Sequence, residues 1–146
     1  INKDLIPIPD ELKMFHYNNQ YILLTTPSGN INITLKGFMK FLQLNIDGLN
    51  GKDNYLKSET YKQMFSFYPI YNIGWWVESD KSILKYTHRG SNGTFYSFAG
   101  FSPSQSIGIV VMTNTYKEEG LTDIIDLLTT KYAKHSGASV MNGISK

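Results

Sequence analysis

The sequence predicts an α+β protein in which an antiparallel β-meander is flanked by helices. Apolar residues recur at helical spacing over residues 34–48 and again over 121–133. Between residues 71 and 113 the apolar residues instead follow a period of two that is interrupted by short turns, which is typical of consecutive antiparallel strands. With 146 residues, of which 41% are hydrophobic and 18% charged, the chain fits one domain spanning 1–146, with 134–146 expected to form a loose polar tail.

Three helices are expected. The first begins at Thr34, a residue type that favours the N-cap, and ends at Gly48, a residue that commonly stops a helix. A shorter helix is predicted from Ser58, as its N-cap, to about Phe65, and the last runs from Leu121 to about Ala133. Residues 1–30 are punctuated by prolines and predict little regular structure apart from a short strand at Tyr21–Leu24.

Four strands are expected in the meander, at Asn72–Glu78, Ile83–His88, Thr94–Phe101 and Ile107–Thr113. The last of these is a continuous apolar run, which predicts a strand that is buried on both faces. Because the connections are short, each strand should pair with the next along the chain.

Composition excludes several classes of function. The chain has no cysteine, so disulfides, thiolate catalysis and cysteine-based metal sites are ruled out. The histidines at 16, 88 and 135 lack ligand spacing, so neither a metal nor another cofactor is expected. The fourteen basic residues are scattered and only one is arginine, which disfavours nucleic-acid binding. No apolar run approaches the roughly 20 residues of a transmembrane segment.

The main candidate for chemistry is the polar segment Thr87–Gly93. Its glycines let the backbone approach another group closely, and the neighbouring His88 and Arg89 would suit an anionic or carbonyl ligand. A second interpretation stays open, namely a glycine-rich hairpin turn with exposed polar neighbours, because Gly, Asn and Ser are ordinary turn residues.

Other candidates are weaker. Ser82–Lys85 has the Ser-x-x-Lys form of a serine nucleophile with its lysine base, but a chain of this composition contains about one such tetrapeptide by chance. In the strand predicted there, Ser82 and Lys85 would face opposite sides. Tyr17–Asn19 is a literal Tyr-x-Asn that is expected to be a surface turn, and Trp75 with Trp76 is more typical of a sheet face than of a ligand stack. No other nucleophile–base pair is apparent.

An ordered series of segments resembles the C-terminal half of the β-lactamase and penicillin-binding-protein family of serine hydrolases, in particular class C β-lactamases, D-alanyl-D-alanine carboxypeptidases and related esterases. The similarity covers about residues 27–133, and the expected fold is therefore part of a β-lactamase-like fold. The segments that carry it are Pro27–Gly29, Ile33–Leu42, Leu56–Thr60, Tyr71–Val77, His88–Phe95, Phe101–Pro103 and Ile107–Asn114.

The resemblance assigns roles within the polar segment. The family's third active-site motif, Lys or His, then Ser or Thr, then Gly, falls on His88, Arg89 and Gly90. His88 would then orient the substrate or a tyrosine base, Gly90 would permit close approach, and the Ser91 N–H would be an oxyanion-hole donor. Arg89 replaces the usual hydroxyl residue and would grip a substrate carboxylate, with Asn92 also in the substrate-binding set.

The family's Ser-x-x-Lys and Tyr-x-Asn motifs would lie N-terminal to residue 1. The chain alone is therefore expected to be inactive, and its partner would be the missing N-terminal segment or a second copy. In the complete enzyme the resemblance implies a small-molecule or peptide substrate, a role at the bacterial cell wall, and a periplasmic or extracellular location. Apolar residues of Ile83–His88 and Thr94–Phe101 should be exposed where that partner is absent. The alternatives are a non-catalytic binding or scaffold domain derived from this family, and an unrelated α+β interaction module.

Overall fold

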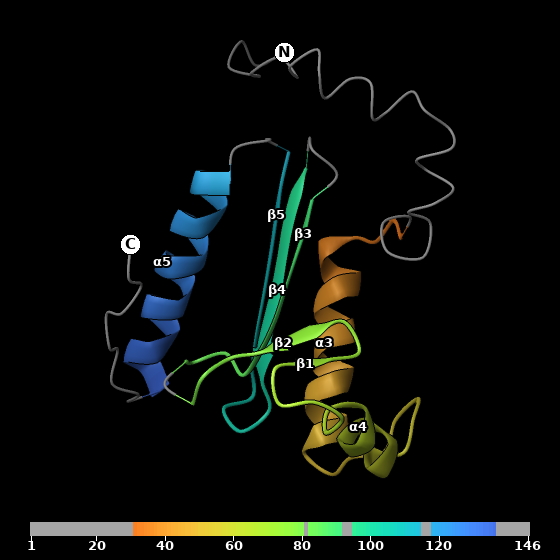
Figure 1. The fold of residues 1–146 in the computed structure, drawn as a ribbon. Helices are drawn as coiled ribbons and strands as arrows, with labels where there is room; N and C mark the ends of the chain where they lie inside the picture. Colours follow the sequence, from red (N-terminus) through yellow and green to blue (C-terminus); the bar gives the residue numbers. More distant parts are fainter. Residues whose placement is uncertain (1–30, 81, 92–94, 115–117, 137–146) are drawn as a thin grey trace.

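A computed structural model describes residues 31–80, 82–91, 95–114 and 118–136 of the chain (Figure 1). The predicted strand at Tyr21–Leu24 and the candidate Tyr17–Asn19 lie outside the described residues, as do Asn92 and residues 137–146 of the predicted tail. The first residues of that tail, 134–136, belong instead to the last helix.

The described residues form an α+β arrangement with one five-stranded antiparallel sheet, which confirms the predicted class. Its strands lie in the order β1-β2-β3-β4-β5, so each pairs with the next along the chain. Helices α3 and α5 cover opposite faces of the sheet (Figure 1). The elements are α3 (Leu35–Leu49), α4 (Ser58–Met64), β1 (Tyr71–Asn72), β2 (Trp75–Val77), β3 (Tyr86–Ser91), β4 (Tyr96–Ser102), β5 (Ile107–Thr113) and α5 (Glu118–Ser136).

The predicted strand at Asn72–Glu78 is wrong as a single element, because the chain reverses within it. Ile73 and Gly74 both have positive φ, 37° and 89°, and this left-handed turn folds β1 back on β2. The hairpin is anchored by Asn72, whose side chain is 1% exposed and bonds both the N–H and the C=O of Tyr68, at 2.8 and 2.7 Å. The meander therefore has five strands and not four.

The strand predicted at Ile83–His88 begins only at Tyr86 in the structure, as β3. Leu84 lies outside the strand and packs over Gly100 of β4, where a side chain at position 100 would collide with the Leu84 side chain. The strand then continues beyond the predicted end to Ser91. β4 likewise starts two residues after Thr94, whereas β5 has the predicted bounds.

The two N-terminal helices follow the predicted ranges, with corrections at their ends. The Thr34 hydroxyl accepts the N–H of Gly37 at 3.1 Å, so the predicted N-cap is confirmed. Gly48 does not stop α3 but lies inside it. Ser58 is not an N-cap either, because it is the first residue of α4 and its N–H donates to Asp53 Oδ1 at 2.8 Å. A carboxylate from the preceding loop thus takes the role assigned to Ser58.

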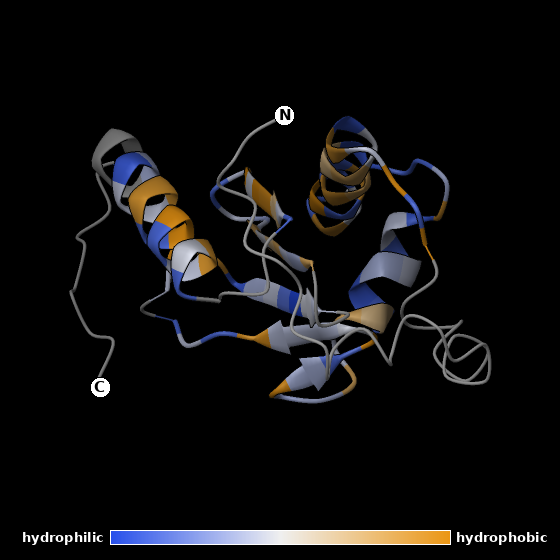
Figure 2. Cartoon of the chain, turned by 90° about the horizontal axis from the view of Figure 1, so that it is seen from above, coloured by the Kyte–Doolittle hydropathy of each residue, from blue (hydrophilic) through white to orange (hydrophobic). Residues whose placement is uncertain are grey.

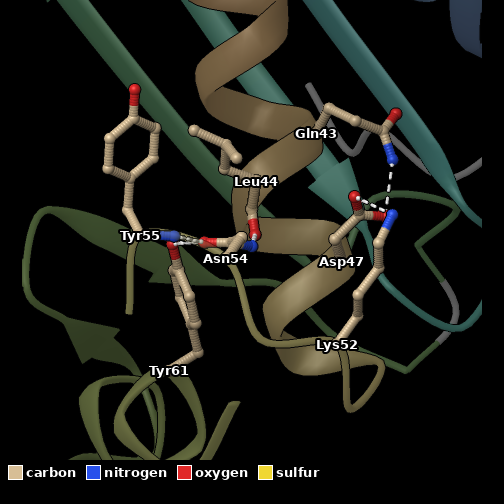
Figure 3. Close-up of polar contacts among 7 residues, drawn as sticks. All are labelled: Gln43, Leu44, Asp47, Lys52, Asn54, Tyr55 and Tyr61. Atoms are coloured by element: carbon tan, nitrogen blue, oxygen red, sulfur yellow. Dashed lines mark hydrogen bonds and ion pairs between the residues drawn. The ribbon is translucent and has the colours of Figure 1, made fainter. Parts of the chain in front are cut away.

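The loop between α3 and α4 is held against α3 by Asn54 (Figure 3). Its amide nitrogen donates to the Leu44 carbonyl at 2.9 Å, and its amide oxygen accepts from the Tyr61 hydroxyl at 2.6 Å. One asparagine therefore links both helices to the loop that joins them.

Two apolar clusters lie on opposite faces of the sheet, as the view from above shows with the strands between α5 and α3 (Figure 2). β5 contributes Val110 to the cluster under α3 and Ile109 and Val111 to the cluster under α5. The prediction that this strand is buried on both faces is therefore confirmed only for the α5 face, because on the α3 face Val110 is partly buried and Met112 is 40% exposed. The buried members under α3 are Leu42, Ile46, Phe65, Trp75, Ala99 and Phe101, and those under α5 are Leu84, Phe98, Ile109, Val111, Leu121 and Ile125.

The apolar residues of Ile83–His88 and Thr94–Phe101 are not exposed as expected. Leu84 and Phe98 are each only 3% exposed because α5 and its neighbours cover them, and Phe95 is the large exposed apolar residue of these two segments. Exposed apolar side chains gather instead near the β1–β2 hairpin, on residues 67–76. Among the described helices, none is both long enough and apolar enough to cross a bilayer.

Candidate functional site

The second half of β3 extends past the strand beside it. β2 pairs with β3 only through Trp76 with Thr87 and Val77 with Tyr86, whereas β3 continues to Ser91. Within the described residues, His88–Ser91 therefore has a strand neighbour on the β4 side alone. His88–Ser91 belongs to the candidate segment Thr87–Gly93, and these four residues lie in a strand at an edge of the sheet, while Asn92 and Gly93 lie outside the described residues.

Strand alternation divides the candidate residues between the two faces of the sheet. His88 lies on the α3 face, where its ring is 6.3 Å from the ring of Trp75 in a nearly perpendicular arrangement. Arg89 lies on the α5 face, with its guanidinium 5.7 Å from the ring centroid of Phe98. Because side chains alternate along a strand, Gly90 shares the face of His88 and Ser91 shares the face of Arg89. The structure therefore brings His88 and Gly90 together and places Arg89 on the other side.

Gly90 leaves the backbone accessible beside His88. It pairs with Ser97 of β4, and a Cβ at position 90 would lie 3.1 Å from Ser97 Oγ. The hydroxyl of Ser97 thus belongs to the same surface, which the sequence alone did not predict. No local signal could have identified it, because the register between β3 and β4 depends on pairing across their connection.

An aromatic wall borders this surface. Trp75 is 7% exposed, and its ring stacks with that of Phe41 of α3 at 6.4 Å. On the same face, Tyr86 packs against Phe65 and Phe101 with ring centroids 4.7 and 5.2 Å away. Burial raises the pKa of the Tyr86 phenol above its usual value, an effect that the nearby Lys85 partly opposes. Tyr86 is therefore protonated at neutral pH and serves here as an apolar wall, not as a base.

The raised pKa of Tyr86 predicts a loss of stability in alkali. The folded state disfavours the phenolate, so this contribution is complete below the unfolded pKa of about 10 and disappears as the pH rises through the higher folded pKa. Urea unfolding between pH ~8 and ~11 should show a smaller decrease in stability for Tyr86→Phe than for the wild type. The matched control is Tyr55→Phe, which removes a phenol that is 84% exposed and should leave the wild-type decrease unchanged. If the unfolding free energies of the wild type and Tyr86→Phe decreased identically with pH, this would contradict a raised pKa of Tyr86.

Ser82 and Lys85 are not arranged as a nucleophile and its base. The Lys85 ammonium pairs with Asp80 Oδ1 at 2.7 Å, and this hydrogen bond lowers the Asp80 pKa. The Ser82 hydroxyl accepts the N–H of Leu84 at 3.3 Å. Residues 82–85 form a bend that precedes β3, and not the start of the predicted strand. Ser82 and Lys85 therefore bond to different groups and not to each other.

Among the described residues, no three His, Asp or Glu side chains lie close enough together to hold a metal ion. Comparisons with protein-family models, with curated proteins and with solved structures found no match to this chain. Its function is therefore inferred from the residues of β3 and from what surrounds them.

Proposed function

We propose that this chain is the C-terminal portion of a serine hydrolase of the β-lactamase and penicillin-binding-protein type, acting by acyl transfer on a β-lactam, peptide or ester. The observation that carries the proposal is the half-strand His88–Ser91, which extends past β2 at an edge of the sheet. His88 and Gly90 match the first and third positions of the family's third motif, and Arg89 stands in place of its hydroxyl residue. The ordered likeness over residues 27–133 supports it.

The proposed substrate lies along this edge on the α3 face. His88 would supply positive charge or a hydrogen bond to an anionic group, and the bare Gly90 would let the acyl group approach the strand. The backbone N–H of Ser91 would stabilise the oxyanion that develops as the carbonyl is attacked. Ser97, beside Gly90, adds a hydroxyl to this set. Arg89 lies on the other face of the sheet, the α5 face, with its guanidinium over the Phe98 ring. A substrate bound on the α3 face would therefore not contact Arg89.

The nucleophile would come from a segment outside these 146 residues. The chain contains one Ser-x-x-Lys, at Ser82–Lys85, and there the lysine is held by Asp80. A serine that lacks an activating base is a weak nucleophile, so the isolated chain is expected to bind substrate without turning it over.

Binding by the isolated chain tests the site. A short peptide ending in D-alanyl-D-alanine, titrated calorimetrically, should bind, and His88→Ala should weaken binding about 10-fold through loss of one charge-assisted contact. Arg89→Ala is the matched control, since it removes a neighbouring cation from the opposite face and should change the affinity less than about twofold. A larger effect for Arg89→Ala would place the ligand on the α5 face. Equal affinity for a peptide with an amidated C-terminus would show that no anionic group is recognised.

Covalent labelling separates catalysis from binding. A fluorescent penicillin should leave the isolated chain unlabelled and should label a serine of a second polypeptide in the native assembly, as intact mass would show. The alternative is a non-catalytic scaffold domain, which is favoured by Arg89 at the position of the family's hydroxyl residue. A native assembly that binds the peptide and takes no label would support that alternative and overturn the hydrolase proposal.

A further inference from the structure

Asn50, at the C-terminus of α3, bonds that helix to the turn between β4 and β5. Its side-chain nitrogen donates to the Pro103 carbonyl at 2.9 Å, across 53 positions of sequence. The same carbonyl accepts the Ser106 N–H at 3.1 Å, and Ser106 has a positive φ of 53°. A residue other than glycine is strained in this left-handed region and stays there only when its surroundings hold it. The Asn50 hydrogen bond contributes to holding this turn.

The residue after Asn50 is a glycine, and an asparagine followed by glycine is chemically labile. Glycine has no side chain to hinder attack of its own backbone nitrogen on the asparagine side chain, so this pair deamidates more readily than other asparagine pairs. Gly51 has a φ of 95°, and a Cβ there would meet nothing within 4 Å. Both residues are exposed, so water reaches them.

Deamidation at this pair needs water and no other reactant. The Gly51 nitrogen, after losing its proton to solvent, forms a bond to Asn50 Cγ. The Cγ–Nδ2 bond breaks, and Nδ2 takes up a proton from water and leaves as ammonia. The resulting cyclic imide adds one water molecule and opens to aspartate or isoaspartate. No atom is oxidised or reduced.

The native fold keeps the reacting groups apart. The ψ of Asn50 is 9°, so the Gly51 nitrogen nearly eclipses the backbone nitrogen of Asn50 and points away from the side chain that it would attack. The Gly51 N–H donates to the Gly48 carbonyl at 3.1 Å, and the Asn50 N–H donates to the Ile46 carbonyl at 3.0 Å. Ring closure therefore requires the end of α3 to unwind and the bond to Pro103 to break. Local opening of this kind costs less than global unfolding.

We infer that Asn50 is a deamidation site that reacts only when the C-terminus of α3 opens, and that the reaction makes this opening permanent. An aspartate cannot donate to the Pro103 carbonyl, and it places a negative charge at the negative end of the helix dipole. Isoaspartate also lengthens the backbone by one atom, so the hydrogen bonds of Gly51 and Lys52 to α3 cannot re-form in their present register. The inference goes beyond the proposed function, since it applies to a hydrolase and to a scaffold domain alike.

Reaction rates test whether the fold protects the site. The full chain and a synthetic peptide of residues 41–52 are incubated together in mildly alkaline buffer. Trypsin, which cuts after lysine, releases the same segment from the chain, so fragmentation mass spectrometry distinguishes Asn50 from the Asn-Gly pairs at 92–93 and 142–143. The peptide is too short to hold a stable helix and should react at least about 10-fold faster than the folded chain. Urea below the unfolding transition should narrow this difference.

Stability measurements test the effect on the turn. Asn50→Asp reproduces one product of the reaction and should lower the equilibrium constant of folding about 10-fold, as urea unfolding would show. Asn114→Asp is the matched control, because it makes the same chemical change at an exposed asparagine after β5, and it should change this constant less than about twofold.

Equal deamidation rates in the peptide and the folded chain would overturn protection by the fold. Reaction in neither of them, or in the peptide alone at every urea concentration below the transition, would overturn the assignment of Asn50 as a site in this chain. A deamidated chain that unfolds at the same urea concentration as the unmodified chain would overturn the permanent opening. None of these readouts depends on hydrolysis of a substrate, so the inference can fail while the proposed function stands.

Discussion

Replacing Gly48 with alanine is expected to destabilise the chain by about 3 kcal/mol or more, at the upper end of overpacking effects. A Cβ at this position would lie 2.1–2.5 Å from ring carbons of Tyr61, far inside van der Waals contact. Tyr61 is 4% exposed and its hydroxyl is bonded to Asn54, which is itself bonded to the Leu44 carbonyl (Figure 3). The ring therefore has little room to move, and either α4 must shift away from α3 or the Asn54 network must break.

Urea unfolding followed by circular dichroism measures this effect. Gly120→Ala is the matched control, because that glycine also lies in a helix and nothing stands within 4 Å of its added Cβ. This control should raise stability by up to about 1 kcal/mol through helix propensity. In a Tyr61→Ala background, Gly48→Ala should cost less than about 1 kcal/mol, since the clash has been removed. A full cost in that background would show that the glycine is required for another reason.

Phe101→Ala is expected to cost about 3–5 kcal/mol, the usual range for removing a fully buried aromatic ring. Phe101 is 0% exposed, and its ring lies 5.0 Å from Trp75 and 5.7 Å from Phe65, with both contacts close to perpendicular. It joins β4 to β2 and to α4, so its removal opens a cavity at the point where these elements meet. Because Trp75 also contacts His88, the loss should loosen the wall of the candidate site as well.

Two further variants serve as controls for the stability loss of Phe101→Ala. Phe95→Ala removes the same side chain at a position 55% exposed and should cost less than about 1 kcal/mol. Phe101→Leu keeps much of the volume and should recover more than half of the stability that alanine loses. Peptide binding measured on folded Phe101→Leu then reports whether the Trp75–His88 contact is needed in its native geometry. A cost below about 1 kcal/mol for Phe101→Ala would contradict the burial assigned to this ring.

Several features followed from short stretches of sequence because their causes are local. The Thr34 cap needs only a hydroxyl three residues before an N–H of the first helical turn. The bounds of Ile107–Thr113 follow from an apolar run between turn residues, and α5 follows from one helical stripe. The likeness of the segment at His88–Gly90 to a family motif also requires only the order of residues along the chain.

Other features depend on contacts between residues that are distant in the sequence. Gly48 reads as a helix stop, but its role is set by the ring of Tyr61, thirteen positions later. The start of β3 depends on Leu84 finding the bare backbone of Gly100, and the position of Ser97 beside Gly90 depends on strand register. Local patterns specify which face of an element is apolar, but not which partner covers that face or where a neighbouring strand stops. Only the tertiary structure could therefore place His88 and Arg89 on opposite sides of the sheet.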